Sequence, residues 1–174
     1  MKLRKLNLQE TVFLGLLTAV DLVLQKLSFG PVMVKVGLGF IGASLLGYFF
    51  GPWWGSVGAL ACDLLSSALF GQEGGFFIGF TISAMLSVAI YGAFYYQRPV
   101  KIWRIVAATL LVTVVVNILL NTLWLHLMYG LAWRAALITR LPKELLVPWL
   151  QMAVSYLVLK ALAQAKVTKL LKRD

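Results

Sequence analysis

The run "WRIVAATLLVTVVVNILLNTLWLHL", from Trp103 to Leu127, decides the fold class of the chain. After Arg104 it holds no charged side chain, and apart from threonines its only polar members before His126 are two asparagines. A helix rises ~1.5 Å per residue and a bilayer core is about 30 Å thick, so a helical run of this length can cross it. The run therefore predicts a transmembrane helix.

The composition of the whole chain agrees with a membrane location. Its 174 residues are 61% hydrophobic and 13% charged, with a mean hydropathy of +0.89, which leaves too little polar surface for a soluble domain. The net charge of +10 could suggest nucleic acid, but the basic residues form short clusters between long uncharged runs, as in loops beside membrane spans. We predict an integral membrane protein that binds no nucleic acid.

Apolar runs separated by turn-forming residues predict six transmembrane helices in one domain, residues 1–174. The predicted spans are 8–27, 36–51, 53–70, 76–96, 103–127 and 144–164. The second and third are short and form a hairpin at "FGPWWG", because Pro52 suits the first turn of a helix. The first run begins like a secretory signal, but Asp21 interrupts it and no small-x-small cleavage site follows, so we expect a retained helix.

The distribution of basic residues predicts the orientation. With six spans, both termini lie on one side, together with the loop between the fourth and fifth spans. That side carries Lys2, Arg4, Lys5, Arg98, Lys101, Arg104, Lys160, Lys166, Lys169, Lys172 and Arg173. The other side carries Lys26, Lys35, Arg134, Arg140 and Lys143. The positive-inside rule therefore predicts an all-α membrane protein with both termini in the cytoplasm.

Three cations are then unusual, because Arg134, Arg140 and Lys143 lie on the outer side against the general bias. Cations on the outer side, in a short segment between two membrane spans, indicate an anionic ligand that arrives from outside. The alternative for each one singly is a solvated loop charge or an anchor for lipid phosphate. Because three cations occur together, we favour the interpretation that they bind an anionic ligand.

Polar side chains within the spans point to a pocket. Ionisable and amide side chains are costly in a membrane and normally face the protein interior. Asp63 on the third span and Asn121 on the fifth, with Asn117 one helical turn earlier, are expected to lie in the outer half of the bundle. We predict an outward-opening pocket floored by Asp63 and Asn121 and rimmed by the three cations.

Aromatic residues accompany this pocket in the sequence and could stack on a flat heterocycle while the carboxylate and amide bond its edge. They are Phe76, Phe77, Trp124, Tyr129 and Trp133. For each aromatic alone, a place facing lipid or in an interfacial belt is the alternative role.

A strip of small residues on the first span, Thr11, Gly15 and Ala19, would let another helix approach closely. Such strips also serve packing within one chain. No nucleotide-binding, catalytic or metal-binding motif is present, and Cys62 is the only cysteine. A chain of this kind is expected to bind a solute and to depend on other subunits to move it.

Several segments resemble one known family. The size, the six spans, "GYFFGPWWGSVGALACDLL", the strip on the first span and "NTLWL" followed by "RLPK" are similar to the substrate-binding S components of energy-coupling-factor vitamin transporters, above all the folate-specific members. The resemblance implies a bacterial plasma-membrane protein that captures folate and associates with a membrane-embedded T component and two cytoplasmic ATPases. Family members present Ala-x-x-x-Ala to the T component, where this chain has Gly15 and Ala19.

The resemblance also suggests roles for the pocket residues. Folate has a flat pterin with a donor-rich edge, an aromatic middle and a tail with two carboxylates. Asp63 and Asn121 are expected to bond the pterin edge, and Trp124 with Phe76 or Phe77 to sandwich the rings. Arg134, Arg140 or Lys143 would hold the tail. The Gly-rich loops 28–37 and 70–79 are expected to act as lids, and no cofactor or metal is expected.

Three alternatives remain at this point. One is an S component for another vitamin such as thiamine, although a positively charged ligand would leave the outer cations unexplained. Another is a small membrane enzyme that acts on lipid with Asp63 as a base, for which no second acid or metal ligand is evident. The third is a purely structural subunit of a membrane complex.

Overall fold

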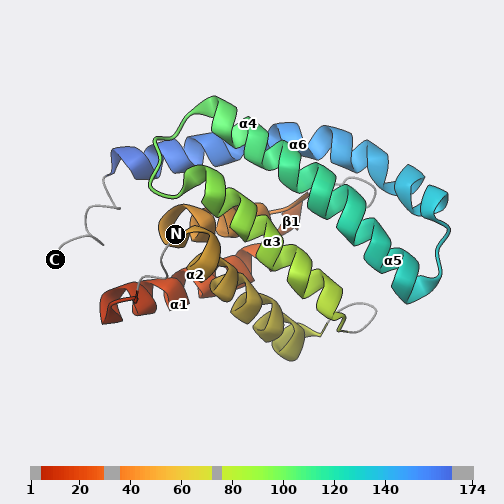
Figure 1. Ribbon diagram of the computed structural model, residues 1–174, viewed down its shortest axis with the longest axis horizontal. Helices are drawn as coiled ribbons and strands as arrows, with labels where there is room; N and C mark the ends of the chain where they lie inside the picture. The colour runs from red at the N-terminus through yellow and green to blue at the C-terminus, as the bar shows by residue number, and fades with distance from the viewer. Residues whose placement is uncertain (1–4, 30–35, 72–75, 166–174) are drawn as a thin grey trace.

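The computed structural model describes residues 5–29, 36–71 and 76–165, in which the regular structure is helical apart from two short strands (Figure 1). The helices are α1 (Leu8–Lys26), α2 (Gly39–Phe70), α3 (Ile78–Tyr95), α4 (Ile102–Leu111), the π-helical segment η2 (Val112–Leu120), α5 (Asn121–Tyr129) and α6 (Trp133–Gln164). The strands β1 (Ser28–Phe29) and β2 (Val36–Gly37) pair antiparallel.

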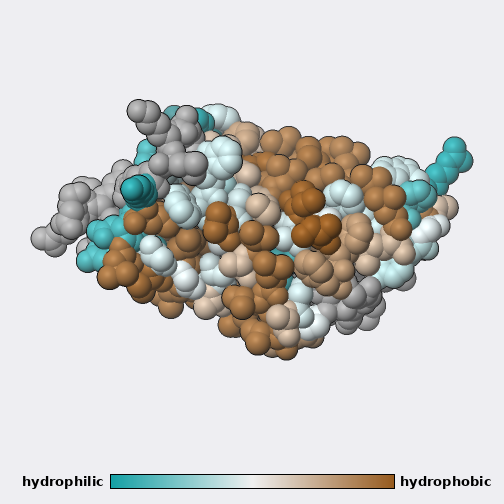
Figure 2. Space-filling model, turned by 60° about the horizontal axis from the view of Figure 1, so that its bottom comes forward, coloured by the Kyte–Doolittle hydropathy of each residue, from teal (hydrophilic) through white to brown (hydrophobic). Residues whose placement is uncertain are grey.

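Five helical stretches in the described part of the chain are long and apolar enough to cross a membrane. They are Leu8–Lys26, Gly39–Phe70, Ile78–Tyr95, Ile102–Tyr129 and Arg140–Gln164. Many of their large apolar side chains lie on the molecular surface, and Figure 2 shows broad hydrophobic areas on one face. Apolar surface of this extent is characteristic of a protein that contacts lipid or other membrane helices.

The helix α1 begins at a capping box and has two distinct faces. The Asn7 side chain accepts from the backbone N–H of Leu8 at 2.6 Å, and Glu10 accepts from the backbone N–H of Asn7 at 3.0 Å. This reciprocal arrangement satisfies backbone donors that would otherwise lack partners. One face of α1 is buried against α2, including Leu14 and Leu17, and the opposite face is exposed.

The structure differs from the predicted hairpin between the second and third spans. Both runs belong to α2, which is bent at Gly51 rather than divided by a loop. Gly51 has φ 73° and ψ −171°, a conformation that favours glycine, and a Cβ here would lie 2.9 Å from the Tyr96 ring. Pro52 follows at once and removes a helical hydrogen bond. The helix therefore bends at this point and continues.

The predicted fifth span is one continuous helix from Ile102 to Tyr129, but its middle part, η2, is π-helical. Figure 1 shows α4 and α5 joined into a long rod beside α6. In a π-helix the backbone bonds link residues i and i+5, so the wider turn changes which side chains share a face. Asn117 lies within this segment and Asn121 directly after it.

The segment before the predicted last span is helical rather than a loop. We expected a loop before residue 144, but α6 starts at Trp133, so Arg134, Arg140 and Lys143 lie on its first turns. The turn before it is short, and Gly130 ends α5 with a left-handed φ of 63°. Residues such as Ala, Leu and Arg, which fill the segment before Pro142, have high helix propensity, and α6 continues through this proline.

Candidate ligand pocket

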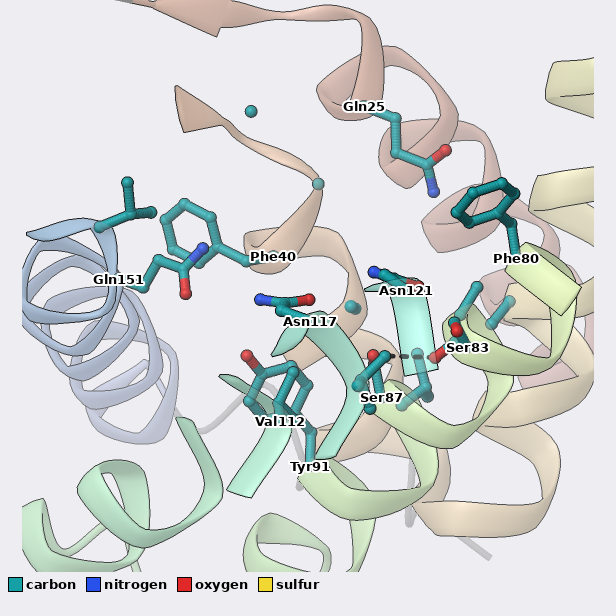
Figure 3. A pocket seen from close by; sticks show the side chains of 18 of the residues that line it. Gln25, Phe40, Phe80, Ser83, Ser87, Tyr91, Val112, Asn117, Asn121 and Gln151 are labelled. Atoms are coloured by element: carbon teal, nitrogen blue, oxygen red, sulfur yellow. Dashed lines mark hydrogen bonds between the residues drawn. The ribbon is translucent and has the colours of Figure 1, made fainter. Parts of the chain in front are cut away.

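A cavity of about 460 Å³ lies among α1, α2, α3, η2, α5 and α6. This volume falls in the range of about 300–1,000 Å³ that is usual for small-molecule pockets. Its charged wall residues are Asp21, Asp63, Arg140, Lys143 and Glu144. Figure 3 shows four amide side chains that also line it, namely Gln25, Asn117, Asn121 and Gln151. The cavity thus combines both signs of charge with groups that can donate and accept hydrogen bonds.

Four residues selected from the sequence meet at this cavity. Asp63 comes from the C-terminal half of α2, Asn121 from the start of α5, and Arg140 and Lys143 from α6. Phe40, Phe80 and Tyr91 form the aromatic part of the wall, and no sequence pattern distinguished them from the other aromatic residues. The cavity can therefore surround a flat ring with a polar edge and also offer two cations.

Asp63 is held from behind by α3. The hydroxyl of Thr81 donates to Oδ2 of Asp63 at 2.6 Å, a short bond of the kind expected between a hydroxyl and a carboxylate. The Ser67 hydroxyl donates to the backbone carbonyl of Asp63 at 2.9 Å. The carboxylate thus has a defined orientation at the cavity wall.

The three residues of the predicted aromatic sandwich, Trp124, Phe76 and Phe77, do not line the cavity. The Trp124 indole N–H donates to Oγ of Ser83, a cavity-lining residue, at 2.9 Å. The ring centroids of Trp124 and Phe77 lie 5.7 Å apart. Neither ring lines the cavity itself, so the pair forms a layer next to Ser83. Phe76 is 51% exposed and does not line the cavity.

A network on α6 and η2 includes a residue for which the sequence suggested no role. Glu144 is only 8% exposed, and the Asn117 side chain donates to its Oε2 at 3.1 Å. Arg140, one helical turn before Glu144, donates to the backbone carbonyl of Asn117 at 3.4 Å. Arg134, by contrast, is exposed and does not line the cavity. The i, i+4 spacing of Arg140 and Glu144 could have indicated this pair.

A second polar group lies where α1 meets α2. Gln25 donates to Oδ2 of Asp21 at 3.2 Å, and its Nε2 lies 3.3 Å from Sγ of Cys62. Asp21 is buried, and its Oδ1 packs against Gly42, where any Cβ would clash with it. Cys62 is therefore buried in a polar contact with Gln25.

The small-residue strip lies on the exposed face of α1. Thr11, Gly15 and Ala19 are all exposed, and a Cβ at Gly15 would meet no atom within 4 Å. The strip is therefore not used for packing among the described residues. The predicted lids fall partly outside the described residues, namely at 30–35 and 72–75.

The chain is similar to proteins of one known family. Residues 9–159 match the family model described as the ECF transporter, substrate-specific component. The chain belongs to this family. It is therefore a component of a transport system and not an enzyme, as the absence of catalytic motifs suggested.

Relatives within the ECF substrate-specific components are similar over most of the chain. A folate transporter FolT from Clostridium novyi is 32% identical over 143 residues, which are 82% of this chain and 81% of that protein. A folate transporter FolT from Leuconostoc mesenteroides is 34% identical over 95% of this chain and 92% of its own length.

A solved structure is similar to the whole bundle of this ECF component. It is a crystal structure of FolT bound with folic acid, with a TM-score of 0.80 and 37% sequence identity. The match covers 87% of this chain and 93% of that one. The arrangement of helices around the cavity is therefore shared with a protein that binds folic acid.

Proposed function

We propose that this chain captures folate with high affinity and delivers it as the substrate-binding subunit of an ECF transporter. The observation that carries the proposal is the similarity, at a TM-score of 0.80, to FolT bound with folic acid. The cavity of about 460 Å³ supports it independently, because its size, polar edge groups and two cations suit a flat heterocycle with a carboxylate tail.

The residues of the cavity divide naturally between the two ends of such a ligand. In the proposed arrangement Asp63 and Asn121 bond the pterin edge, while Arg140 and Lys143 hold the carboxylates of the tail. Arginine can bind a carboxylate through two parallel bonds, and lysine acts as a compact point charge. Arg134 is exposed and would contribute a longer-range attraction.

The aromatic pair is proposed to support the ring. Trp124 and Phe77 are in contact, and Ser83 links the indole to the cavity wall. A modest shift of the segment before α3 would let Phe77 or Phe76 cover a bound ring, which is the lid function proposed for residues 70–79. Loop 28–37 is proposed as the second lid.

The membrane arrangement is part of the same proposal. If the two halves of α2 are counted separately, the chain has six crossing segments and both termini face the cytoplasm of a bacterial cell. The pocket then opens outward, where folate arrives. The exposed strip Thr11, Gly15 and Ala19 is proposed to contact the membrane T component, which connects the chain to two cytoplasmic ATPases.

Calorimetric titration of the detergent-purified chain tests the proposal. We expect saturable binding of folic acid at one site per chain and no comparable binding of thiamine, whose positive charge does not suit Arg140 and Lys143. Tighter binding of thiamine than of folic acid, or no folic acid binding by a folded sample, would refute the assignment.

A further inference from the structure

We propose that Thr81 is a positioning residue that sets the selectivity of the pocket for heterocycles with a donor-bearing edge, through its bond to Asp63. The inference rests on the proposed function, in which Asp63 bonds the edge of the ligand. It concerns a residue that does not itself line the cavity.

The geometry around Thr81 favours positioning over direct binding. Thr81 is 1% exposed and lies in the first turns of α3, behind Asp63 as seen from the cavity. Its hydroxyl donates to Oδ2 of Asp63 at 2.6 Å. Because the two oxygens of a carboxylate are rigidly linked, a bond that fixes Oδ2 also fixes the direction of Oδ1. A ligand edge with two parallel donors can bond both oxygens only when the Asp63 carboxylate has the matching direction.

The same turns of α3 also fix the neighbouring aromatic group. Gly79 packs so closely on Trp124 that a Cβ would lie 2.6 Å from Cδ2 of the indole, and Ser83 accepts the indole N–H. Thr81 and Ser83 are two residues apart on a helix, so they point to different sides, one toward α2 and one toward α5. The start of α3 thus holds both a hydrogen-bonding group and a ring in place.

Burial makes the loss of this bond consequential. A threonine hydroxyl and a valine methyl have nearly the same shape, so Thr81→Val removes the bond and leaves the packing almost unchanged. The carboxylate of Asp63 can then rotate among several orientations, and only some of them suit the ligand edge. Affinity should fall most for ligands that present both parallel donors on this edge, and less for ligands that present only one.

The test is a titration of the full chain with folic acid and with 2-desaminofolic acid, in which hydrogen replaces the exocyclic amino group. We expect the wild type to prefer folic acid. Thr81→Val should weaken folic acid binding about tenfold and 2-desaminofolic acid binding by a smaller factor, because that ligand keeps only the ring N–H on this edge. Thr81→Ser, which keeps the hydroxyl, should restore most of the preference.

A matched control is Thr113→Val, the same change at a buried threonine of η2 that does not line the cavity. It should leave both affinities unchanged. Equal weakening of both ligands by Thr81→Val, or no weakening at all, would overturn the positioning role. If the folded wild type does not bind folic acid, the proposed function itself fails, and that result differs from the loss of selectivity in one variant.

Discussion

At the scale of single residues, the α6 wall of the cavity carries two cations and one carboxylate within five residues. Arg140 and Lys143 face the cavity with Glu144, and Asn117 contacts both Arg140 and Glu144. A buried carboxylate near an arginine compensates part of its charge. The bond from Arg140 to the Asn117 carbonyl gives the guanidinium a defined direction, and an oriented group lowers the ordering cost of binding a ligand carboxylate.

Replacing Arg140 tests this preorganised site. Arg140→Gln removes a charge-assisted bond of about 1.5–3 kcal/mol and should weaken folic acid binding at least tenfold in a titration. Lys143→Gln should cost less, because a lysine makes a single flexible contact. Arg98→Gln, at an exposed arginine that does not line the cavity, is the control. An unchanged affinity for folic acid in Arg140→Gln would show that the carboxylate tail does not bind at the α6 wall.

Some residues of the cavity could be selected from the sequence for a physical reason. Asp63, Asn121, Arg140 and Lys143 carry groups that are costly against lipid, so the helices that hold them turn these faces inward. Glu144 was missed because an acidic residue at the predicted start of a helix is ordinary. The wall positions of Gln25, Ser83 and Ser87 and the bond from Thr81 depend on how separate helices pack, which the sequence does not display.

At the scale of elements, α1 connects the cavity to the exposed strip. Buried Asp21 and exposed Gln25 both line the cavity, while Gly15 and Ala19 lie on the exposed face opposite the buried residues of α1. One helix thus carries both the ligand side and the proposed partner side. Because the two faces do not share residues, a change on the exposed face can be made without altering the cavity.

Gly15→Trp tests the separation of these two faces. A Cβ at Gly15 meets no atom within 4 Å, so the bulky ring can be accommodated in the isolated chain. We expect folic acid binding by the purified variant to remain within twofold of wild type, while folate uptake by cells with the complete transporter is abolished. Uptake at the wild-type rate would contradict the partner role of the strip. Loss of binding as well would indicate misfolding.

Three features of the helices could not be predicted in full from sequence patterns. The loop expected before residue 144 is helical, because α6 begins at Trp133 and is maintained through Pro142, although a proline removes a helical hydrogen bond. The π-helical form of η2 has no compositional signature, since a run of Val and Leu suits several helical geometries. The bend at Gly51 was located correctly, because glycine followed by proline restricts the backbone in a recognisable way, but its outcome as one bent helix was not predicted.

At the scale of the whole molecule, the cavity is built from six helical segments that come from both ends of the chain. No single element could form it, and its two proposed ends lie on different parts of the bundle. Asp63 belongs to α2, held by α3, whereas Arg140 and Lys143 belong to α6. A ligand that contacts both ends links the two parts of the bundle. The proposed orientation of folate therefore depends on how α2 and α6 are arranged relative to each other in the bundle.

An experimental structure of the chain with bound folic acid tests this central claim most directly. The account predicts that the pterin edge lies within hydrogen-bond distance of Asp63 and Asn121, and that the tail carboxylates contact Arg140 and Lys143. Folic acid bound in the reverse direction, with its carboxylates away from α6, or bound outside this cavity, would contradict it.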